Sequence, residues 1–395
     1  MSKRFISFNA SLFLVELVFV IEVTACVVIA PSAVKSLRLD PSLSGLIVNS
    51  YLYVAFASLV IFLALRKWVA RLLSAGKCLY WGAWIFVAGN LACLQAVSVE
   101  LFLIGRVVQG VGGAMAMVGE LWSASEVYNK KITVALFWAE CGSAIGIVIG
   151  PAMGGFIAGI GTGTWRILFI INAAIGAASA VTAWYALRVE SIAMIPAPIK
   201  KFRITWWFMW LILVQAAVAA LAIGAEFLMS DYMQIRLHKS PNFVGYMATL
   251  ASIGAIMGSW IMLMINRSFT KYAQSALCAM IALHVLMVYL IMNNYINLSS
   301  VPIFGIGMCL GIANVAIYAE ISKKVGQDFF LPATLVYLVA VLAGNALGIE
   351  MVALTEGRGW SLSRAELIMV AAPIIPLGAM MLWRFISPKT DDAGS

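Results

Sequence analysis

Residues Trp138–Gly159 read WAECGSAIGIVIGPAMGGFIAG, and this stretch decides what kind of fold the chain can adopt. Its glycines recur every four residues, at Gly142, Gly146, Gly150 and Gly154. On an α-helix this spacing places the glycines along one face, where a second helix can approach almost to backbone contact. Pro151 lies inside the run and predicts a bend. The stretch therefore predicts a kinked membrane helix with one close-packing face, which either packs statically or lets helices slide.

The composition of the whole chain agrees with a membrane protein. Of its 395 residues 63% are hydrophobic and only 11% are charged, whereas soluble domains are roughly 45–50% apolar and about 25% charged. A bilayer-spanning helix needs about 20 mostly apolar residues, and such runs fill nearly the whole sequence. The predicted surroundings are therefore the lipid bilayer, and the fold class is an all-α membrane protein.

Charged and turn residues divide the chain into twelve apolar segments. We predict transmembrane helices near residues 11–34, 43–65, 73–95, 99–122, 132–159, 165–187, 205–229, 242–265, 272–292, 299–320, 330–354 and 365–386. The longest internal connection contains Pro196 and Pro198 and separates two sets of six. The predicted domains are a six-helix bundle at 1–187, a cytoplasmic linker at 188–203, and a second six-helix bundle with a short cytoplasmic tail at 204–395.

The basic residues predict the topology. The net charge of +9 comes mostly from lysines and arginines in short loops on one side of the predicted spans, as the positive-inside rule requires of a cytoplasmic side. Both termini are therefore predicted to be cytoplasmic, and no nucleic-acid partner is expected. The six cysteines have no metal-ligand spacing, so neither a metal site nor a disulfide framework is expected.

Two sets of six spans suggest an internal duplication about an axis along the membrane normal. The fifth and eleventh helices would then be equivalent, and each would lie at the seam between the halves. A second small-residue face, at Gly254 and Gly258, lies in the eighth span. The residues predicted to form the mobile interface are Gly142, Gly146, Gly150, Pro151, Gly154, Gly254 and Gly258. Ordinary static packing is the alternative for each face.

Ionisable residues inside spans are the strongest functional candidates, because they are costly in lipid and usually face a cavity or a partner. Glu22 is predicted at mid-bilayer and Arg106 a third of the way into the fourth span. A carboxyl group that moves toward and away from such a cation could load and unload a proton, although the pair could also only hold helices together. Glu16, Glu140 and Glu226 are secondary candidates for binding protons or a cationic substrate.

Three further glutamates lie near the ends of spans, where they could reach interfacial water. They are Glu120, Glu320 and Glu350. Amides and aromatic residues inside the spans are candidates for a substrate cavity: Asn49, Tyr51, Tyr53, Gln109, Gln215, Asn314 and Asn345. For Asn345, between two glycines, a hydrogen bond between helices is the alternative.

Four motifs in the first half occur in a family's order and spacing. The segment GRVVQGVGGA, at 105–114, resembles the R-x-x-Q-G-x-G-x-A signature of drug:proton antiporters in the major facilitator superfamily. The G-x-x-x-G-P-x-x-G-G at 146–155 resembles their antiporter motif, and TWRILFIIN at 164–172 resembles the W-R-x-x-F-x-x-N that opens their sixth helix. I-E-V-T at 21–24, followed by Pro31, is similar to their L-D-x-T motif with Glu22 at the acidic position.

This resemblance implies a transporter of two bundles around a central cavity that works by rocking alternating access. It implies that Arg106 and Glu22 serve proton coupling and that the glycine stripe belongs to the interface between the halves. It also implies a proton gradient as the energy source without a cofactor, a monomer, and a bacterial inner membrane. One departure is FLALRKWVAR at 62–71, which lacks the glycine and aspartate of the family's cytoplasmic latch.

Proton-coupled export of small amphipathic molecules is the leading hypothesis for function. The alternative on the same fold is a proton-coupled carrier, for uptake or export, of a specific anionic metabolite or siderophore, with Arg106 as a substrate clamp. An enzyme or receptor is disfavoured, because the chain has only two histidines and no phosphate loop or nucleophile arrangement. A channel is disfavoured by the lack of a re-entrant loop or pore-lining repeat.

Overall fold

The computed structural model describes residues 3–40, 43–128, 132–188, 205–265, 269–325 and 327–357. Within these ranges the chain forms eleven long α-helices. They are α1 (Lys3–Ser36), α2 (Ser44–Leu72), α3 (Ala75–Leu94), α4 (Val99–Tyr128), α5 (Ile132–Ile160), α6 (Arg166–Arg188), α7 (Trp206–Asp231), α8 (Pro241–Ile265), α9 (Phe269–Met292), α10 (Ser300–Lys324) and α11 (Gln327–Gly357). A π-helical turn, η3 (Tyr232–Arg236), extends α7, and a 3₁₀ turn, η4 (Asn297–Ser299), precedes α10.

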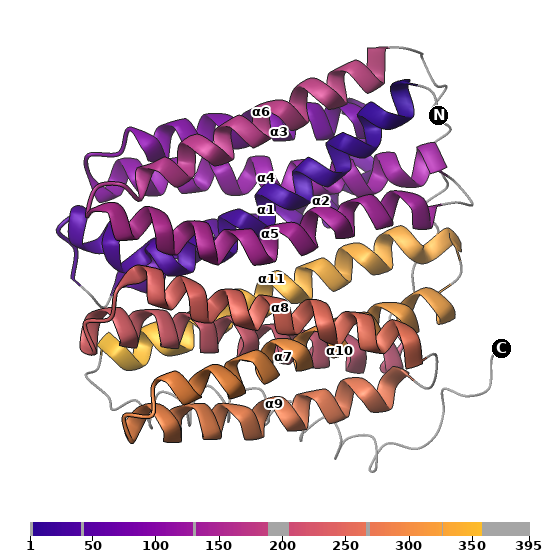
Figure 1. The fold of residues 1–395 in the computed structure, drawn as a ribbon. Coiled ribbons are helices and arrows are strands. Elements are labelled where there is room, and N and C mark those ends of the chain that lie inside the picture. The colour runs from indigo at the N-terminus through magenta and orange to yellow at the C-terminus, as the bar shows by residue number, and fades with distance from the viewer. Residues whose placement is uncertain are drawn as a thin grey trace.

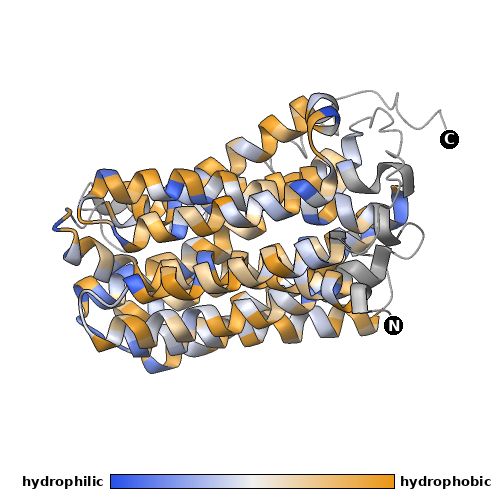
Figure 2. Cartoon of the chain, turned by 90° about the horizontal axis from the view of Figure 1, so that it is seen from above, coloured by the Kyte–Doolittle hydropathy of each residue, from blue (hydrophilic) through white to orange (hydrophobic). Residues whose placement is uncertain are grey.

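All eleven helices are long and apolar enough to cross a membrane, and each overlaps one predicted span. Hydrophobic residues run along the helices, and hydrophilic residues gather toward the helix ends (Figure 2). Several helices continue past the predicted spans, because backbone hydrogen bonding need not stop where the apolar sequence does. The predicted twelfth span, 365–386, and the linker after Arg188 lie outside the described residues.

The helices form two layers, with α1–α6 in one and α7–α11 in the other (Figure 1). We call these layers the N-terminal half and the C-terminal half. The loops that follow odd-numbered helices lie at one end of the bundle, which we call the outer end. The opposite end is called the cytoplasmic end, and both names follow the orientation predicted from the charges.

Helix contacts repeat between the two halves. In the N-terminal half α1 packs on α5, and α4 on α2 and α3; in the C-terminal half α7 packs on α11, and α10 on α8 and α9. Across the seam α5 packs on α8 and α2 on α11. Each contact in one half has a counterpart six helices further along the chain, so that α1–α5 corresponds to α7–α11. For the two contacts across the seam the count continues from twelve back to one, so that α5–α8 corresponds to α11–α2. The predicted position of the fifth and eleventh helices at the seam is therefore confirmed.

The glycine stripe of α5 does not lie at the seam, so that prediction is wrong. A Cβ atom built on Gly142 would overlap the carbonyl oxygen of Phe13 in α1. The remaining stripe glycines, Gly146, Gly150 and Gly154, likewise face α1, at Leu17, Thr24 and Ala25. The stripe thus lets α1 and α5 approach closely inside the N-terminal half. Helical periodicity identifies the smooth face of a helix but not the neighbour that covers it.

The stripe in α8 requires the same correction. Cβ atoms on Gly254 and Gly258 would overlap the backbone of Phe304 and Met308 in α10, inside the C-terminal half. At the seam itself, Gly155 of α5 meets Gly245 of α8, where a Cβ atom on Gly155 would lie 2.9 Å from the Gly245 Cα. Pro151 is the one predicted interface residue at this crossing, with its carbonyl oxygen 2.7 Å from a Cβ atom on Gly245.

The hydrogen bonds described between the halves all lie toward the outer end. Ser230, near the end of α7, donates to the carbonyl oxygen of Val27 in α1, and Gln234, in the turn η3, donates to that of Val28; both distances are 3.0 Å. Near the start of α2, the amide of Asn49 donates to the carbonyl oxygen of Ala346 in α11 over 3.1 Å. The outer end is therefore closed by specific polar contacts as well as by the crossing of α5 and α8.

Candidate functional site

A buried ion pair joins α1 to α4 at the centre of the N-terminal half. Glu22 and Arg106 are both 0% exposed, and the Nη1 of Arg106 donates to the Oε1 of Glu22. The same Nη1 donates to the Oε1 of Gln109 over 2.8 Å, and Nη2 donates to the carbonyl oxygen of Val48 in α2 over 3.2 Å. The two residues that the sequence singled out are thus in direct contact.

Glu22 accepts hydrogen bonds from two further helix positions. Its second oxygen, Oε2, accepts from the Nδ2 of Asn172 in α6 over 2.6 Å. Its Oε1 also accepts from the Sγ of Cys26, one turn along α1, over 3.4 Å. Donors on both oxygens suit an ionised carboxylate, which is an acceptor at every lone pair.

A chain of amides continues from the ion pair into α3. The Nε2 of Gln109 donates to the Oδ1 of Asn90 over 3.1 Å, and the Nδ2 of Asn90 donates to the carbonyl oxygen of Phe86 over 2.8 Å. Gln109 is 0% exposed. Its predicted place in a substrate cavity is therefore wrong in this structure, because Arg106 and Asn90 occupy its polar atoms.

Aromatic rings surround the guanidinium of Arg106. Its Cζ lies 5.0 Å from the ring centre of Tyr51 and 5.8 Å from that of Phe102, within the range of cation–π attraction. Its Nε has no hydrogen-bond partner among the described residues. The network is thus a charged pair enclosed in apolar surroundings, where removing either charge leaves the other uncompensated.

The partners of this pair were only partly visible in the sequence. Asn172 ends the motif quoted for the sixth helix, so a signal for it was present. Asn90 and Cys26 carried no signal, because they are single polar residues in apolar runs, and Tyr51 was considered only as a residue of a substrate cavity. Only the packing of α2 and α3 against α4 brings Tyr51 and Asn90 to Arg106.

A second polar cluster lies at the seam between α2 and α11. The hydroxyl of Tyr53 donates to the Oε2 of Glu350 over 2.6 Å, and the Nδ2 of Asn49 donates to the same oxygen over 3.1 Å. Asn49 and Tyr53 were predicted to line a substrate cavity, but here they hold the two halves together. Glu350 has partners across the seam, where the sequence had suggested only contact with interfacial water.

The other predicted polar residues lie in the C-terminal half. Gln215 of α7 is buried and donates to the Oδ1 of Asn314 in α10 over 2.8 Å. Asn345 is half-buried on α11. Glu226 of α7 is also half-buried, and its Oε1 has no hydrogen-bond partner among the described residues. These three residues do not join the network around Arg106.

Three further carboxylates lie on helices that contact one another: Glu16 on α1, Glu120 on α4 and Glu140 on α5. Glu16 and Glu140 were predicted as secondary carboxylates, whereas Glu120 was taken for an interfacial residue. Its spacing from Arg106 was a usable signal, because fourteen residues are about four helical turns and place both side chains on one face of α4.

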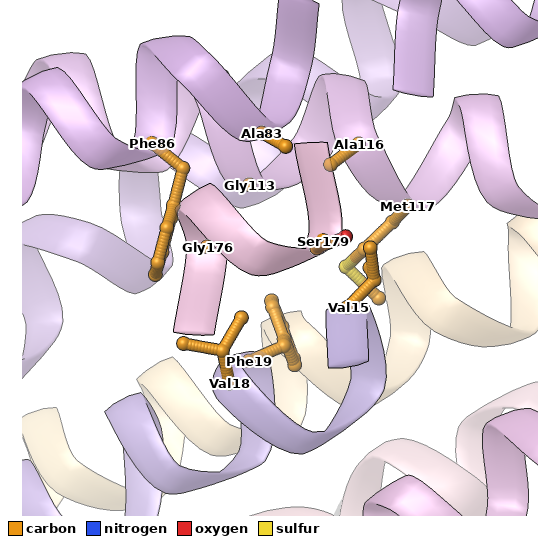
Figure 3. Close-up of a pocket in the computed structure, with 10 residues that line it drawn as sticks. All are labelled: Val15, Val18, Phe19, Ala83, Phe86, Gly113, Ala116, Met117, Gly176 and Ser179. Carbon is orange, nitrogen blue, oxygen red and sulfur yellow. The ribbon is translucent and has the colours of Figure 1, made fainter. Parts of the chain in front are cut away.

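A small cavity lies inside the N-terminal half, between α1, α3, α4 and α6 (Figure 3). Its volume is about 20 Å³, and apolar side chains such as Val18, Phe19 and Phe86 line it. Sites for drug-sized ligands are about 300–1,000 Å³. This cavity is therefore a packing void next to the glycines of α4 and α6, and a substrate site must be sought elsewhere.

Comparisons with known proteins agree with this architecture. The profile of the Major Facilitator Superfamily matches residues 12–330. The chain is 28% identical over 156 residues to a protein of Pectobacterium atrosepticum provisionally named multidrug resistance protein MdtD, covering 39% of this chain and 32% of that protein. A Klebsiella pneumoniae protein of the same name is 30% identical over 152 residues, 38% of this chain and 31% of that protein. The match thus spans about a third of the relatives' length.

Solved structures share the fold over nearly the whole chain. The crystal structure of a D-xylose–proton symporter has a TM-score of 0.70 at 13% identity and covers 98% of this chain and 99% of that one. A bacterial homologue of the human lysosomal transporter Spinster, in an inward-facing and occupied conformation, has a TM-score of 0.67 at 17% identity, with 98% of each chain covered. Since the family profile covers most of the sequence, the protein belongs to the Major Facilitator Superfamily and is an integral, multi-pass membrane transporter.

Proposed function

We propose that this protein is a secondary transporter of the bacterial inner membrane that exports small amphipathic molecules in exchange for protons. The observation that carries the proposal is the buried pair of Glu22 and Arg106. An isolated charge in such surroundings is costly. Protonation of Glu22 would free Arg106 from its carboxylate, so proton binding and a rearrangement of α1 against α4 would be linked.

The arrangement of the seam supports alternating access. The described hydrogen bonds between the halves gather toward the outer end, while Glu140, toward the cytoplasmic end of α5, is exposed. This pattern suits a state that is closed to the outside and accepts substrate from the cytoplasm. Export then requires the contacts of Asn49, Tyr53 and Ser230 to break while contacts form at the other end.

The direction and the class of cargo rest on the relatives. Their printed name is a multidrug resistance protein, and the match covers 32% and 31% of their lengths. The antiporter-like G-x-x-x-G-P-x-x-G-G of α5 adds support from this chain's own sequence. Export of amphipathic compounds is the cargo and direction that these two observations favour.

The geometry disfavours the alternative of a carrier that clamps an anionic metabolite with Arg106. The guanidinium is completely buried, and both terminal nitrogens already donate, to Glu22, Gln109 and Val48. An anion could replace Glu22 at the Nη1 of Arg106 only by displacing that carboxylate. The same guanidinium is well placed to respond to the protonation of that carboxylate.

Flux into proteoliposomes with an imposed pH gradient tests the proposal. Ethidium, chloramphenicol and citrate serve as cationic, neutral and anionic probes. We expect the gradient to accelerate ethidium or chloramphenicol flux in the wild type. The Glu22→Gln variant should lose this acceleration while keeping exchange without a gradient. Glu22→Asp, which keeps the charge, should retain part of it.

Glu100→Gln is the matched control, because Glu100 lies at the outer end of α4 on the helix that carries Arg106 and is exposed. It should transport like the wild type. Gradient-driven flux that survives in Glu22→Gln would show that the coupling assignment is wrong. Flux of citrate alone would favour the metabolite carrier.

A further inference from the structure

Asn172 of α6 is a partner of Glu22 that keeps one hydrogen-bonding atom unused. Its Nδ2 donates to the Oε2 of Glu22 over 2.6 Å, whereas its Oδ1 has no hydrogen-bond partner among the described residues. The residue is 0% exposed, so bulk water does not satisfy this oxygen. Buried polar atoms are nearly always paired, and an unpaired acceptor beside a titratable carboxyl group therefore requires a physical explanation.

The packing of α6 fixes the backbone that carries Asn172. Phe169 and Asn172 are three residues apart and lie on one face of α6. The ring of Phe169 packs edge to face on Phe102 of α4, with 5.8 Å between the ring centres, and Phe102 lies one turn before Arg106. All of these residues are 0% exposed. The part of Asn172 that can still turn is its amide, because the last torsion of asparagine is broad and roughly two-fold.

Protonation changes the kind of partner that Glu22 needs. An ionised carboxylate only accepts hydrogen bonds, whereas a carboxylic acid also carries one O–H donor. The Oε1 of Glu22 faces the guanidinium of Arg106, whose positive charge disfavours a proton there, so Oε2 is the favoured position. Arg106 and the Nδ2 of Asn172 are donors and cannot accept from this O–H. The unused Oδ1 of Asn172 can accept from it once the amide has made a half-turn.

We propose that Asn172 is a positioning residue that binds both protonation states of Glu22. Its Nδ2 donates to the carboxylate, and after a half-turn its Oδ1 accepts from the carboxylic acid. This inference rests on the proposed proton coupling at Glu22 and adds a residue to it. The bond to Glu22 is the one hydrogen bond described for the Asn172 amide, so the half-turn breaks no other within the described ranges. The unused Oδ1 is thus the acceptor that the protonated state requires.

The other titratable groups of the network leave Glu22 as the one that takes up the proton. The groups around the pair come from α1, α2, α3 and α4: Cys26, Tyr51, Cys93 and Arg106. Thiols and phenols already hold their protons at neutral pH, and a guanidinium is always charged. Further groups on helices packed on α1 form no hydrogen bond or ion pair with Glu22 in the part of the chain that the structure describes: Tyr53, Glu120, Glu140, Arg166, Glu226 and Tyr246.

Difference infrared spectroscopy of the purified full-length protein, recorded as the pH is lowered, tests the amide. The carbonyl band of a protonated carboxyl group that is absent in Glu22→Gln reports Glu22. We expect this band at the lower frequency of a carboxylic acid whose O–H donates a hydrogen bond. The Asn172→Leu variant, which removes both polar atoms at a similar volume, should move it to higher frequency. With an isotope at the asparagine side-chain carbonyl, the wild type should also show an amide band shift that Glu22→Gln lacks.

Asn90→Leu is the matched control. Asn90 is also a fully buried asparagine of the network, but it bonds to Gln109 and Phe86 and has no described bond to Glu22. Its loss should leave the frequency of the Glu22 band unchanged. The isotope measurement needs no substitution at Asn172, so it decides the case if Asn172→Leu does not fold.

Three results would each overturn the role of Asn172: an unshifted Glu22 band in Asn172→Leu, an equal shift in Asn90→Leu, or a labelled amide band that does not respond to pH. Identical spectra for the wild type and Glu22→Gln would instead show that Glu22 takes up no proton. The proposed coupling would then fail together with this inference, so the two failures are distinguishable.

Discussion

At the scale of single residues, Arg106 and Glu22 determine how the N-terminal half can respond to a proton. Both are fully buried, and a buried pair is costly to break because the remaining charge has no counter-ion. We therefore expect Glu22→Gln and Arg106→Gln each to destabilise the protein by about 3–5 kcal/mol. The double variant should lose much less stability than the sum of the two single losses. Melting temperatures of the three variants in one detergent measure this difference.

A strictly additive double variant would contradict this account of the pair. Additivity is the rule for residues that do not interact. Additive losses of stability would mean that each side chain is stabilised by its other partners, Asn172 for Glu22 and Gln109 for Arg106. The ion pair itself would then contribute little.

The sequence could predict the charged pair but not its environment. Glu22 and Arg106 are conspicuous because charges are rare in apolar spans, and their motifs have a fixed spacing. The seam role of Asn49 and Tyr53, and the buried state of Gln109, depend on which helix lies opposite. Glu120 was misjudged because its distance from the span end was considered, but not its position on the face of α4 that bears Arg106.

At the scale of helices, the glycine stripe of α5 controls the distance between α5 and α1. A Cβ atom on Gly142 would overlap the carbonyl oxygen of Phe13, whereas one on Gly163 would have nothing within 4 Å. We expect Gly142→Ala to destabilise the protein by about 1–3 kcal/mol and Gly163→Ala to stay within about 0.5 kcal/mol. Equal melting temperatures for the two variants would show that α1 and α5 are not packed this closely.

The contact between α2 and α11 supplies a test of the closed outer end. A Cβ atom on Gly45 would lie 2.6 Å from the Cβ of Ala353. The two Cβ atoms of a disulfide are about 3.5–4.5 Å apart, so α2 and α11 need to separate only slightly for a disulfide to form between these positions. We expect the Gly45→Cys, Ala353→Cys protein to stop transporting on oxidation and to recover on reduction. Each single cysteine variant is the control. Undiminished flux in the cross-linked protein would mean that this end need not open.

The smooth faces of α5 and α8 illustrate what a helical pattern leaves open. Period-four glycines predict a closely approached face, and that prediction is confirmed for both helices. The neighbour was predicted wrongly in both, because α1 and α10 cover these faces rather than the opposite half. The actual crossing of the halves uses Gly155 and Gly245, which a search for stripes would not select.

At the scale of the whole molecule, orientation determines which end admits substrate. The distribution of basic residues predicts that the loop after α5 is outside and the end of α10 is cytoplasmic. A membrane-impermeant maleimide should therefore label Gly163→Cys in intact cells, and should label Lys323→Cys only after permeabilisation. Both positions are exposed, and labelling of the parent protein's six native cysteines gives the background. The reverse pattern would invert the proposed direction of access.

The positions and order of the first eleven spans were the best-predicted features of the molecule, because apolar length is a direct requirement of the bilayer. Eleven of the predicted spans correspond to helices in the described ranges. The seam position of the fifth and eleventh helices followed from the assumed duplication, whereas their partners, α8 and α2, are known only from the structure.

The central claim is that substrate and proton movements are coupled through Glu22. Its most direct test is the pH inside sealed proteoliposomes, followed with a trapped indicator dye while a transported probe is added to one side. We predict that the probe drives proton movement in the opposite direction in the wild type and in Glu100→Gln, and none in Glu22→Gln. Substrate flux without proton movement in the wild type, or equal proton movement in Glu22→Gln, would contradict the account.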